Sequence, residues 1–549
     1  MKTFAGQTVD VVVVGSGAGG GTFAYGAARA GKSVVLLEKG PWYRDEDYVH
    51  DEIASVRRDM WVPYPTEDPH VLVKEGGKPQ KSPEGWIARC VGGGTVHMSG
   101  FFYRHHPEDF RLARRYPDLP GAELADWPIT YEALAPFYDE VEKIIGVSGK
   151  AGQHPFEPPR AGDYPLEPLA DSNLAEVLDR GIARLGLHGF ATPRAVLSRP
   201  YRGRSPCVYC AFCGSFGCEV GAKSSAASTM VPLALATGRC ELRAGSMVFE
   251  IVTDASGRAT GVRYFDEEGT IVEQKARVVV VGATAVESAR LLLASRSKAH
   301  PEGIGNAEGQ VGRHLHFSAL GKAWAELERA ALPAQLREDD GMPFLGRSVQ
   351  DTYFLKQHAG GYDKGGTLNF IGPHRNPIYT AERLSWRGRP GLWGAKLKAA
   401  LHRYYHEVRE LELEVFAEFL PNPKTFVSLD PEVKDRWGLP AARIDVSVHP
   451  LSRARVTEVT KIGIEVFRAA GAAAAEIETA GGFTGFLQGG TCRMGSDPKE
   501  SVVDARCRVH GVPNLLVVDG GALPTSGGVP NTFTIMANAL RASTLLGKG

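Results

Sequence analysis

The stretch that decides the fold is VDVVVVGSGAGG at residues 9–20, where an apolar, β-branched run leads into a glycine-rich loop. A run of this composition is typical of a strand that is buried on both faces of a parallel sheet. The small residues of TFAYGAARAGK at 22–32 predict a helix, and SVVLLEKG at 33–40 predicts a second strand. The sequence therefore predicts a β-α-β unit over residues 9–40.

The glycine loop of this unit has the spacing of a nucleotide-binding site. Gly15 permits the tight turn, Gly17 lets the backbone approach a pyrophosphate, and Gly20 lets the helix pack on the sheet. The helix, starting near Ala18, would present free N–H groups to the phosphate. Glu38 ends the second strand, where its carboxylate can accept both ribose hydroxyls. We expect a bound nucleotide rather than a glycine turn without ligand, but the motif alone does not distinguish FAD from NAD.

Length and charge limit the classes of function. A chain of 549 residues is too long for one compact core, so more than one domain is expected. The 63 Lys and Arg residues balance the 63 Asp and Glu residues. Without a basic excess there is no electrostatic surface for nucleic acid or an anionic membrane, so we expect a small-molecule partner.

Targeting signals are not apparent in the sequence. The first residues, MKTFAGQTVDVVVVGSG, run directly into the first strand, without the basic, apolar and cleavage regions of a signal peptide. No run of about eighteen apolar residues predicts a membrane span. We therefore expect a cytoplasmic protein, although export together with a signal-bearing partner stays open.

Four ordered motifs in the rest of the chain resemble those of glucose-methanol-choline (GMC) oxidoreductases, a family of FAD-dependent enzymes. The motifs are CVGGGTVHMSGFFYRHHPEDF at 90–110, KARVVVVGATAVESARLLLAS at 275–295, GGTCRMGSDPKESVVD at 489–504, and NLLVVDGGALPTSGG at 514–528, followed by NTFTIMANALRAS at 531–543. Within the family, the chain resembles most the bacterial branch of gluconate, fructose and FAD-linked glucose dehydrogenases, with pyranose oxidases close by. The resemblance implies oxidation of an alcohol or sugar hydroxyl by hydride transfer to flavin N5.

The distribution of these motifs predicts a discontinuous cofactor domain. We expect an α/β protein, α+β overall, with a Rossmann-type FAD-binding domain and an inserted antiparallel-sheet substrate domain. Helices are predicted near 392–406 and 451–471, and strands in LELEVFAEFL and ARIDVSVH. The FAD-binding domain is assigned to 1–50, 85–105, 205–320 and 485–549, and the substrate-binding domain to 106–204 and 321–484.

The resemblance also implies a set of cofactor contacts. Asp519 ends an apolar strand and would hold the ribityl hydroxyls, unless it is only a turn or helix-cap aspartate. The helix beginning near Thr532 would direct its positive end at the flavin N1–C2=O edge. Val248 would contact the adenine through its backbone. The other residues assigned to the cofactor site are Gly93, Thr95, His97, Gly282, Ala283, Gly520 and Asn531.

His97 has two interpretations in this family. In pyranose oxidases, a histidine at the matching place carries the flavin covalently, whereas in related glucose dehydrogenases it does not. We expect a histidine beside the flavin, and covalent attachment is the less favoured alternative. A histidine bonded to backbone in a buried loop is the purely structural interpretation.

Four cysteines are clustered within twelve residues, at Cys207, Cys210, Cys213 and Cys218. Thiolates this close in sequence suit an iron–sulfur cluster better than a zinc ribbon. The sugar-dehydrogenase branch carries a three-iron cluster in this region, with a different cysteine spacing. A [3Fe-4S] or other cluster would pass electrons to an external acceptor, such as an acceptor protein or a small partner subunit. Zinc, free thiols and disulfides are the alternatives, and the other four cysteines, Cys90, Cys240, Cys492 and Cys507, are expected to be packed thiols.

The chain departs from the family at the catalytic base. The family removes the alcohol proton with a histidine before its RMG motif, and here that place holds Leu487. The second catalytic place falls on Pro530, so a local shift would bring Asn531 into the role. Gln488, Asn531 and His316 are therefore the candidate catalytic residues, with His314 as a further alternative base.

Three hypotheses about activity follow from these patterns. The first is a flavin dehydrogenase for a sugar or alcohol that relays electrons through the cysteine cluster. The second is an oxidase that uses O2, with structural cysteines. The third is a flavoprotein without turnover, as the missing histidine at position 487 suggests. The substrate itself cannot be identified from the sequence, because pocket residues vary freely on one fold.

Overall fold

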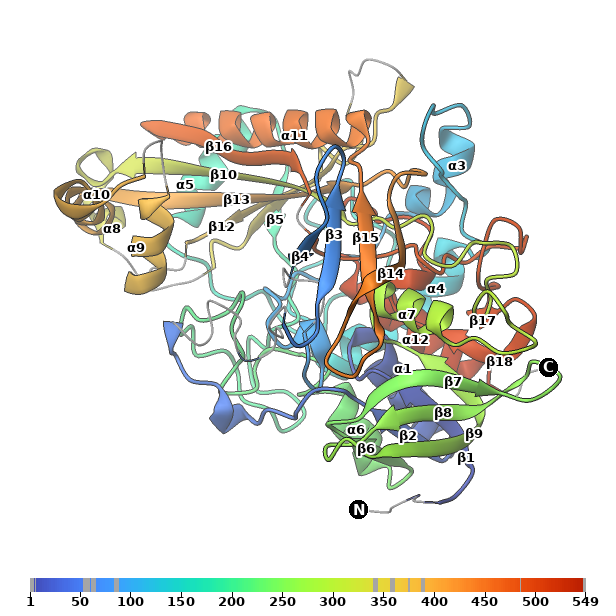
Figure 1. Cartoon of the computed structure of the whole chain (residues 1–549). Helices are drawn as coiled ribbons and strands as arrows, with labels where there is room; N and C mark the ends of the chain where they lie inside the picture. The colour runs from blue at the N-terminus through green and yellow to red at the C-terminus, as the bar shows by residue number, and fades with distance from the viewer. Residues whose placement is uncertain are drawn as a thin grey trace.

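The computed structural model arranges the chain in three main sheets with helices packed against them (Figure 1). It describes residue 4 and residues 6–52, 60, 66–82, 88–338, 344–355, 361–373, 376–386, 391–483 and 485–546. The predicted combination of a parallel cofactor sheet and an antiparallel second sheet is confirmed.

The first sheet contains the predicted β-α-β unit. β1 (Val9–Val14) and β2 (Val34–Leu37) pair in parallel, and α1 (Ala18–Arg29) connects them. The strand order is β17-β18-β9-β1-β2-β6, with β6 (Cys240–Arg243), β9 (Ile271–Val281), β17 (Arg508–Val509) and β18 (Val512–Val517). Along this order, every pair of neighbouring strands from β18 to β6 is parallel. Segments far apart in the sequence therefore meet in one sheet.

Helices and an antiparallel extension complete this part of the molecule. β7 (Met247–Thr253) pairs with β8 (Ala259–Phe265), and β8 pairs with the first half of β9. α1 packs against α6 (Met230–Ala236) and α12 (Thr532–Thr544), and α12 packs against α4 (Tyr131–Ile145). α7 (Ala285–Ala294) follows β9 directly. Val12 and Val13 of β1 and the last three valines of β9, Val279, Val280 and Val281, are fully buried, which explains the continuous apolar sequence there.

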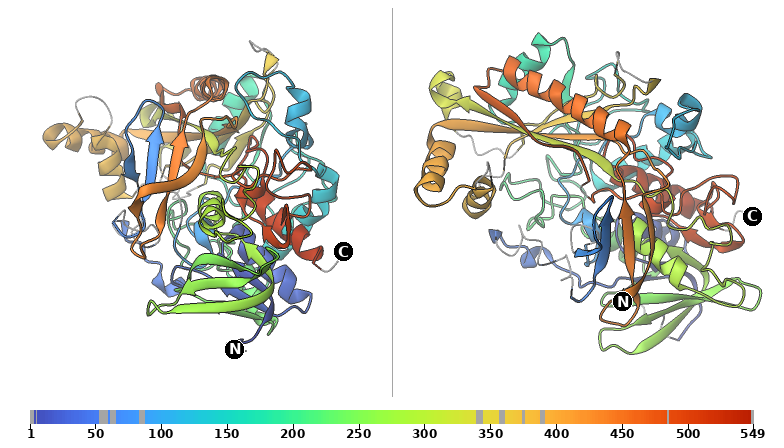
Figure 2. Two further views of the ribbon diagram at one scale, coloured as in Figure 1. Left: turned by 45° about the vertical axis from the view of Figure 1, so that its right-hand side comes forward. Right: turned by 45° about the horizontal axis from the view of Figure 1, so that its top comes forward.

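The second sheet is antiparallel. Its order is β16-β10-β13-β12-β11-β5, with β5 (Gly189–Ala191), β10 (Ser318–Glu328), β11 (Arg347–Val349), β12 (Gly366–Ile371), β13 (Val408–Glu418) and β16 (Ala474–Gly482). α11 (Pro450–Ala469) lies along one face of this sheet and also contacts α5 (Ala175–Arg184) (Figure 2). Its buried residues recur at helical spacing, including Val456, Val459, Gly463 and Phe467.

A third, smaller sheet stands between the other two in Figures 1 and 2. It has the order β14-β15-β3-β4, with β3 (His70–Lys74), β4 (Gln80–Ser82), β14 (Phe426–Lys434) and β15 (Pro440–Val446). β14 and β15 pack against α7 of the first sheet. The sequence did not predict this sheet as a separate unit, because its strands come from two distant segments.

The predicted helices near 392–406 and 451–471 are α10 (Gly394–His406) and α11. Other helices in the described part of the chain are α3 (Leu112–Arg115), α8 (Ala334–Arg337) and α9 (Pro377–Ser385). The strands of the first sheet lie within the residue ranges assigned to the FAD-binding domain. Those of the second sheet lie within the ranges assigned to the substrate domain, except that β10 begins at Ser318, before the assigned boundary at residue 321. β14 and β15, which were also assigned to the substrate domain, instead contact the cofactor side through α7.

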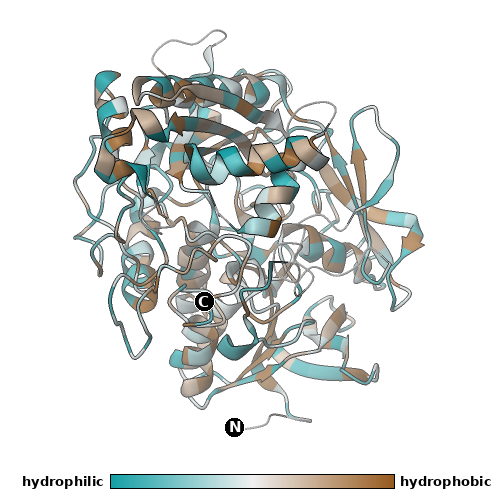
Figure 3. Cartoon of the chain, turned by 90° about the vertical axis from the view of Figure 1, so that its left-hand side faces the viewer, coloured by the Kyte–Doolittle hydropathy of each residue, from teal (hydrophilic) through white to brown (hydrophobic). Residues whose placement is uncertain are grey.

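No helix in the described part of the chain is long and apolar enough to cross a membrane. In the hydropathy view, hydrophilic and hydrophobic residues alternate along the helices (Figure 3). Such mixed composition is typical of helices that bury one face and expose the other to water.

Candidate active site

One cavity of about 450 Å³ collects residues from both large sheets. Residues that follow the carboxyl ends of β1, β2, β9 and β18 line one side, namely Gly15, Glu38, Gly282 and Asp519. Residues of β10 and β13 line the other side, namely Leu320, Lys322, Glu414 and Phe416. Open α/β sheets bind their ligands at the carboxyl ends of the strands, so the cavity lies where a nucleotide is expected.

The glycine loop is closely packed except at one position. Gly15 has φ +87°, and a Cβ there would lie 2.5 Å from the carbonyl oxygen of Gly282. A Cβ on Gly20 would lie 1.9 Å from the carbonyl oxygen of Gly15. In contrast, the nearest protein atoms to a Cβ on Gly17 would be 3.9 Å away. Gly17 lines the cavity, so this open space is where a pyrophosphate fits against the backbone.

Glu38 is buried beside this loop. Its carboxylate accepts hydrogen bonds from the Ser16 N–H at 3.0 Å, the Ser16 hydroxyl at 2.7 Å and the Gly40 N–H at 3.0 Å. Burial raises the pKa of Glu38 above its usual value, and the hydrogen bonds from Ser16 and Gly40 oppose that shift. The carboxylate is thus held in place at the end of β2, where the sequence predicted a ribose contact.

Three helices begin at the cavity wall. The first residues of α1, α7 and α12, which are Ala18, Ala285 and Thr532, all line it. The free N–H groups and the dipole of a helix N-terminus favour negative charge. The convergence of three such termini therefore suits a ligand with phosphates and an electron-rich ring.

The adenine-side residues come from separate elements. Val248 on β7 lines the cavity next to Ser246, whose N–H donates to the Glu38 carbonyl at 2.8 Å. Gly282 and Ala283 line the opposite wall, directly after β9. The structure thus brings together the residues predicted to contact adenine and the adjoining ribose.

Asp519 lies at the other end of the phosphate region. Its carboxylate accepts hydrogen bonds from the Ser288 hydroxyl at 2.5 Å and the Gly521 N–H at 2.7 Å. Burial raises the pKa of Asp519 to about 6, although the Ser288 hydroxyl and nearby N–H groups oppose the shift. Both Asp519 and Gly520 line the cavity, as predicted for a contact to the ribityl chain.

The segment 93–97 forms part of the wall between the sheets. Gly93, Thr95 and His97 all line the cavity. The buried Thr95 hydroxyl donates to the Gly92 carbonyl at 2.6 Å and accepts from the Ala226 N–H at 2.8 Å. These bonds fix the segment, so the predicted position of His97 beside the cofactor agrees with its place in the cavity.

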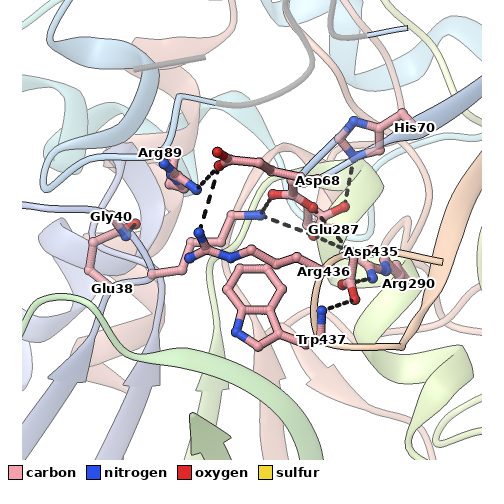
Figure 4. A network of polar contacts seen from close by, with 12 residues as sticks. Glu38, Gly40, Asp68, His70, Arg89, Glu287, Arg290, Asp435, Arg436 and Trp437 are labelled. Carbon is pink, nitrogen blue, oxygen red and sulfur yellow. Dashed lines mark hydrogen bonds and ion pairs between the residues drawn. The ribbon is translucent and has the colours of Figure 1, made fainter. Parts of the chain in front are cut away.

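A buried ionic network lies at the end of the cavity where the adenine contact is predicted (Figure 4). Lys39, next to Glu38, forms an ion pair with Asp68 at 2.5 Å. Glu287 and Arg290 extend from α7, where Arg290 pairs with Asp435 at 2.5 Å. The network therefore ties β2 and α7 to the two segments of the third sheet.

The charges of this network stabilise one another. The imidazole of His70 contacts Glu287 at 2.8 Å. Burial by itself would raise the pKa of Glu287, but Arg290 and Lys39 hold it well below its usual range. Removing one partner of a buried pair typically costs about 3–5 kcal/mol, because the other charge is left uncompensated. The third sheet is thus held firmly over the end of the cavity.

The opposite end of the cavity contains the predicted reactive residues. Asn531 donates from Nδ2 to the carbonyl oxygens of Leu487 at 3.1 Å and Gln488 at 3.3 Å. Leu487 has φ +59°, a left-handed conformation that costs roughly 1–2 kcal/mol for a residue with a side chain. All three residues line the cavity. The Gln488 amide oxygen accepts from the Val286 N–H at 3.4 Å, so this side chain reaches the start of α7.

Comparison with known proteins agrees with this geometry. Models of the family described as GMC oxidoreductase match residues 168–319 and 421–539, and one described as an FAD binding domain matches residues 10–45. The chain is 34% identical to 2-methyl-1,2-propanediol dehydrogenase of Mycolicibacterium austroafricanum, over 99% of this chain and 95% of the relative. The chain belongs to the GMC oxidoreductase family.

Other GMC relatives and a solved structure extend the comparison. The fructose dehydrogenase large subunit of Gluconobacter japonicus is 26% identical, over 98% of this chain and 97% of the relative. Pyridoxine 4-oxidase from Mesorbium loti shares the fold, with a TM-score of 0.61 at 18% identity over 98% of this chain and 99% of that chain. This GMC oxidoreductase is therefore an FAD-dependent enzyme of the class that acts on CH–OH groups, and the predicted GMC resemblance is confirmed.

The structure places the two candidate histidines outside the cavity lining. The fully buried His316 contacts the Leu523 carbonyl through Nε2 at 3.1 Å, and its ring lies against Gly489 and Gly490. His314 contacts Glu123 at 2.9 Å through Nδ1 and Gln310 at 2.9 Å through Nε2. None of these contacts directs either imidazole ring toward Asn531. These positions support structural roles for both histidines, and neither is placed to accept the substrate proton.

Replacing His316 by Gln is expected to change stability in a pH-dependent way. Burial lowers the pKa of His316 to about 4, against about 6.5 in an unfolded chain. Below pH 6.5 the unfolded state binds the extra proton, so this histidine costs the wild type about 2 kcal/mol at pH 5 relative to pH 7. The destabilisation caused by His316→Gln should therefore shrink between pH 7 and pH 5 in thermal unfolding. A loss of stability that is equal at both pH values would contradict a buried neutral imidazole.

The clustered cysteines lie on a loop that reaches the cavity wall. The Ser215 N–H within this loop donates to the His97 carbonyl at 2.8 Å, and Ser215 itself lines the cavity. The Tyr209 N–H donates to Cys207 Sγ at 3.4 Å, and the Lys223 N–H donates to Cys218 Sγ at 3.4 Å. The loop is thus in a position to connect the cofactor site with the protein surface.

The four clustered thiols are not gathered into a group that could hold a metal ion in this structure. Cys207, Cys210, Cys213 and Cys218 are all free and partly exposed. Among the residues that the structure describes, no group of three or more His, Cys, Asp or Glu side chains is placed to hold a metal ion. The remaining cysteines, Cys90, Cys240, Cys492 and Cys507, are buried free thiols, as expected.

Five charged residues that line the cavity were not predicted from the sequence, namely Lys39, Glu287, Arg290, Lys322 and Glu414. Lys322 and Glu414 line it from β10 and β13. Alternation along each strand shows that both side chains lie on the same face as Leu320 and Phe416. The sequence contains that alternation, but only the pairing of the two strands reveals that this face encloses the cavity.

Proposed function

We propose that this enzyme oxidises the hydroxyl group of an alcohol or sugar and passes the hydride to FAD. The single observation that carries the proposal is the shape of the cavity. The cofactor region at the ends of β1, β2 and β9 continues into a chamber walled by β10 and β13 of the second sheet. The names of the relatives, a diol dehydrogenase and a fructose dehydrogenase subunit, support an alcohol or sugar as substrate.

The residues divide into those that would hold FAD and those that would hold the substrate. Gly17 and the start of α1 would bind the pyrophosphate, Glu38 the ribose and Asp519 the ribityl chain. Bound FAD supplies the hydride acceptor of the reaction. The start of α12 at Thr532 would place positive partial charge beside the flavin ring and favour its reduced anionic form.

Asn531 is the residue that we propose to orient the substrate oxygen. Its amide is anchored by the carbonyls of Leu487 and Gln488 and lines the chamber. Neither an amide nor the Leu487 side chain accepts a proton at neutral pH. The hydroxyl proton therefore leaves to another group of the chamber or to water, while hydride leaves the carbon.

Anaerobic mixing of the purified holoenzyme with candidate alcohols and sugars tests this proposal. Bleaching of the flavin absorbance by at least one of them is the expected result. The steady-state rate is then compared with oxygen and with a dye as acceptor, because an oxidase consumes oxygen whereas a dehydrogenase prefers the dye. A flavin that none of the alcohols or sugars reduces would instead favour the third hypothesis, a flavoprotein without turnover.

The iron–sulfur relay is a separate proposal that rests on the cysteine loop. The four closely spaced thiols, the N–H···S bonds and the contact of Ser215 with His97 support it. The arrangement of the thiols in the structure opposes it. The flavin chemistry proposed above does not require a cluster, so no step of the reaction is assigned to one.

Metal analysis of anaerobically prepared protein decides this point. If the loop holds a cluster, the protein contains iron and labile sulfide, and Cys210→Ser lowers both. Flavin reduction by substrate should survive in that variant, because hydride transfer does not involve the thiols. Protein without iron and sulfide would reject the relay and leave the cysteines as structural thiols.

A further inference from the structure

Lys322 and Glu414 form a charged pair inside the substrate chamber. They face each other in register across β10 and β13, with Lys322 Nζ 3.4 Å from Glu414 Oε1. Their side chains keep 38% and 20% of their surface exposed, and both line the cavity. Glu414 raises the pKa of Lys322 above its usual value despite burial, so the lysine is a protonated ammonium. The chamber thus contains a strong donor beside a strong acceptor.

Packing on the other side of the sheet fixes the direction of these side chains. A Cβ on Gly321 would lie 2.1 Å from the Thr460 hydroxyl of α11, and Leu413 lies against Gly463 of the same helix. Successive residues of a strand point to opposite faces. Because Gly321 and Leu413 face α11, Lys322 and Glu414 must face the chamber.

The charged pair lies two residues further along β10 and β13 than an apolar pair on the same face of the sheet. Leu320 pairs with Phe416 on the same face, and Leu487 packs against the cluster that contains both. Two residues along a strand span roughly 7 Å. A substrate whose reacting carbon lies beside Leu487 and Asn531 can therefore extend over the Leu320–Phe416 band and reach the charged pair with a second polar group.

We propose that Lys322 and Glu414 form a subsite for a second hydroxyl group of the substrate, so that the enzyme selects diols and longer polyols over alcohols with a single hydroxyl. This inference rests on the proposed alcohol oxidation and names its substrate class. A second hydroxyl can accept from the ammonium and donate to the carboxylate. An apolar tail would strip water from both charges without replacing those bonds. The pair carries no net charge, so it favours a neutral polyol over a carboxylate or an amine.

The test compares butan-1-ol with butane-1,2-diol, butane-1,3-diol and butane-1,4-diol. Binding is measured by calorimetry on dithionite-reduced holoenzyme, in which no turnover occurs, and flavin reduction is measured on oxidised enzyme. In the wild type, the best diol is expected to bind about tenfold to a hundredfold more tightly than butan-1-ol. Glu414→Gln and the double variant K322M/E414Q should remove most of that advantage. The double variant should also bind butan-1-ol at least as tightly as the wild type, because an apolar tail no longer desolvates two charges.

Glu326→Gln is the matched control. Glu326 lies on the same face of β10 and pairs with Arg403 at 2.8 Å, but it does not line the cavity. Glu326→Gln should keep the diol preference. The double variant K322M/E414Q serves a different purpose: it removes both charges, so that no unpaired Lys322 ammonium destabilises the fold. Equal binding of butan-1-ol and all diols by the wild type would overturn the subsite. So would an equal loss for butan-1-ol and diols in Glu414→Gln, which would assign the pair to the reacting hydroxyl. If none of the four compounds reduces the flavin in any variant, the proposed oxidation fails for this class, independently of the binding preference.

Discussion

Gly17→Leu is expected to yield a folded protein that has lost most of its FAD. The backbone at Gly17 has φ −70°, which any residue adopts, and a Cβ there meets no protein atom within 3.9 Å. The leucine side chain would instead occupy the space in which the pyrophosphate approaches the backbone. An overpacked site of this kind costs about 1–3 kcal/mol, which weakens FAD binding by about tenfold to a hundredfold. Flavin absorbance per protein, after gel filtration, measures the loss.

Gly162→Leu is the control for this experiment. Gly162 is exposed, lies outside the cavity and has no protein atom within 4 Å of a Cβ. This variant should keep full flavin content, because the added side chain meets only solvent. If Gly17→Leu retained as much FAD as Gly162→Leu, the glycine loop would not be the pyrophosphate site.

Asn531→Ala is expected to slow flavin reduction by about a hundredfold to a thousandfold while FAD content stays normal. The substitution removes the amide that lines the chamber and its bonds to the carbonyls of Leu487 and Gln488. The loss of a group that positions the substrate oxygen for hydride transfer has an effect of about this size. Stopped-flow mixing with substrate under anaerobic conditions measures the rate.

Leu487→His separates orientation from proton transfer. If water accepts the proton, this histidine adds a base at the place that the family uses, and the rate should stay equal or rise. A sharp fall would show that the apolar side chain is itself required, for example to hold the substrate against Leu320 and Phe416. Wild-type rates in both Asn531→Ala and Leu487→His would place the chemistry on other residues.

The cofactor half of the site could be predicted from local sequence. The β-branched run at 9–14, the glycine loop and Glu38 belong to one continuous β-α-β unit, and the short-range geometry of such a unit fixes where the phosphate and ribose lie. Asp519 and Thr532 could be placed because they belong to motifs that resemble those of a known family. The helices near 392–406 and 451–471 could also be predicted from the local periodicity of their apolar residues.

The substrate half depended on the tertiary structure. Lys322 and Glu414 are 92 positions apart in the sequence, and only the register of β10 against β13 makes them a pair that faces the cavity. His316 is the opposite case. It was a candidate base because Leu487 occupies the usual histidine position, whereas packing against Gly489 and Gly490 buries it away from the chamber. The sequence by itself thus predicted the fold class and the FAD site, because the β-α-β unit is local and the distant cofactor segments carry motifs that resemble those of a known family. Which side chains meet the substrate was decided by pairings between distant strands, which no local pattern encodes.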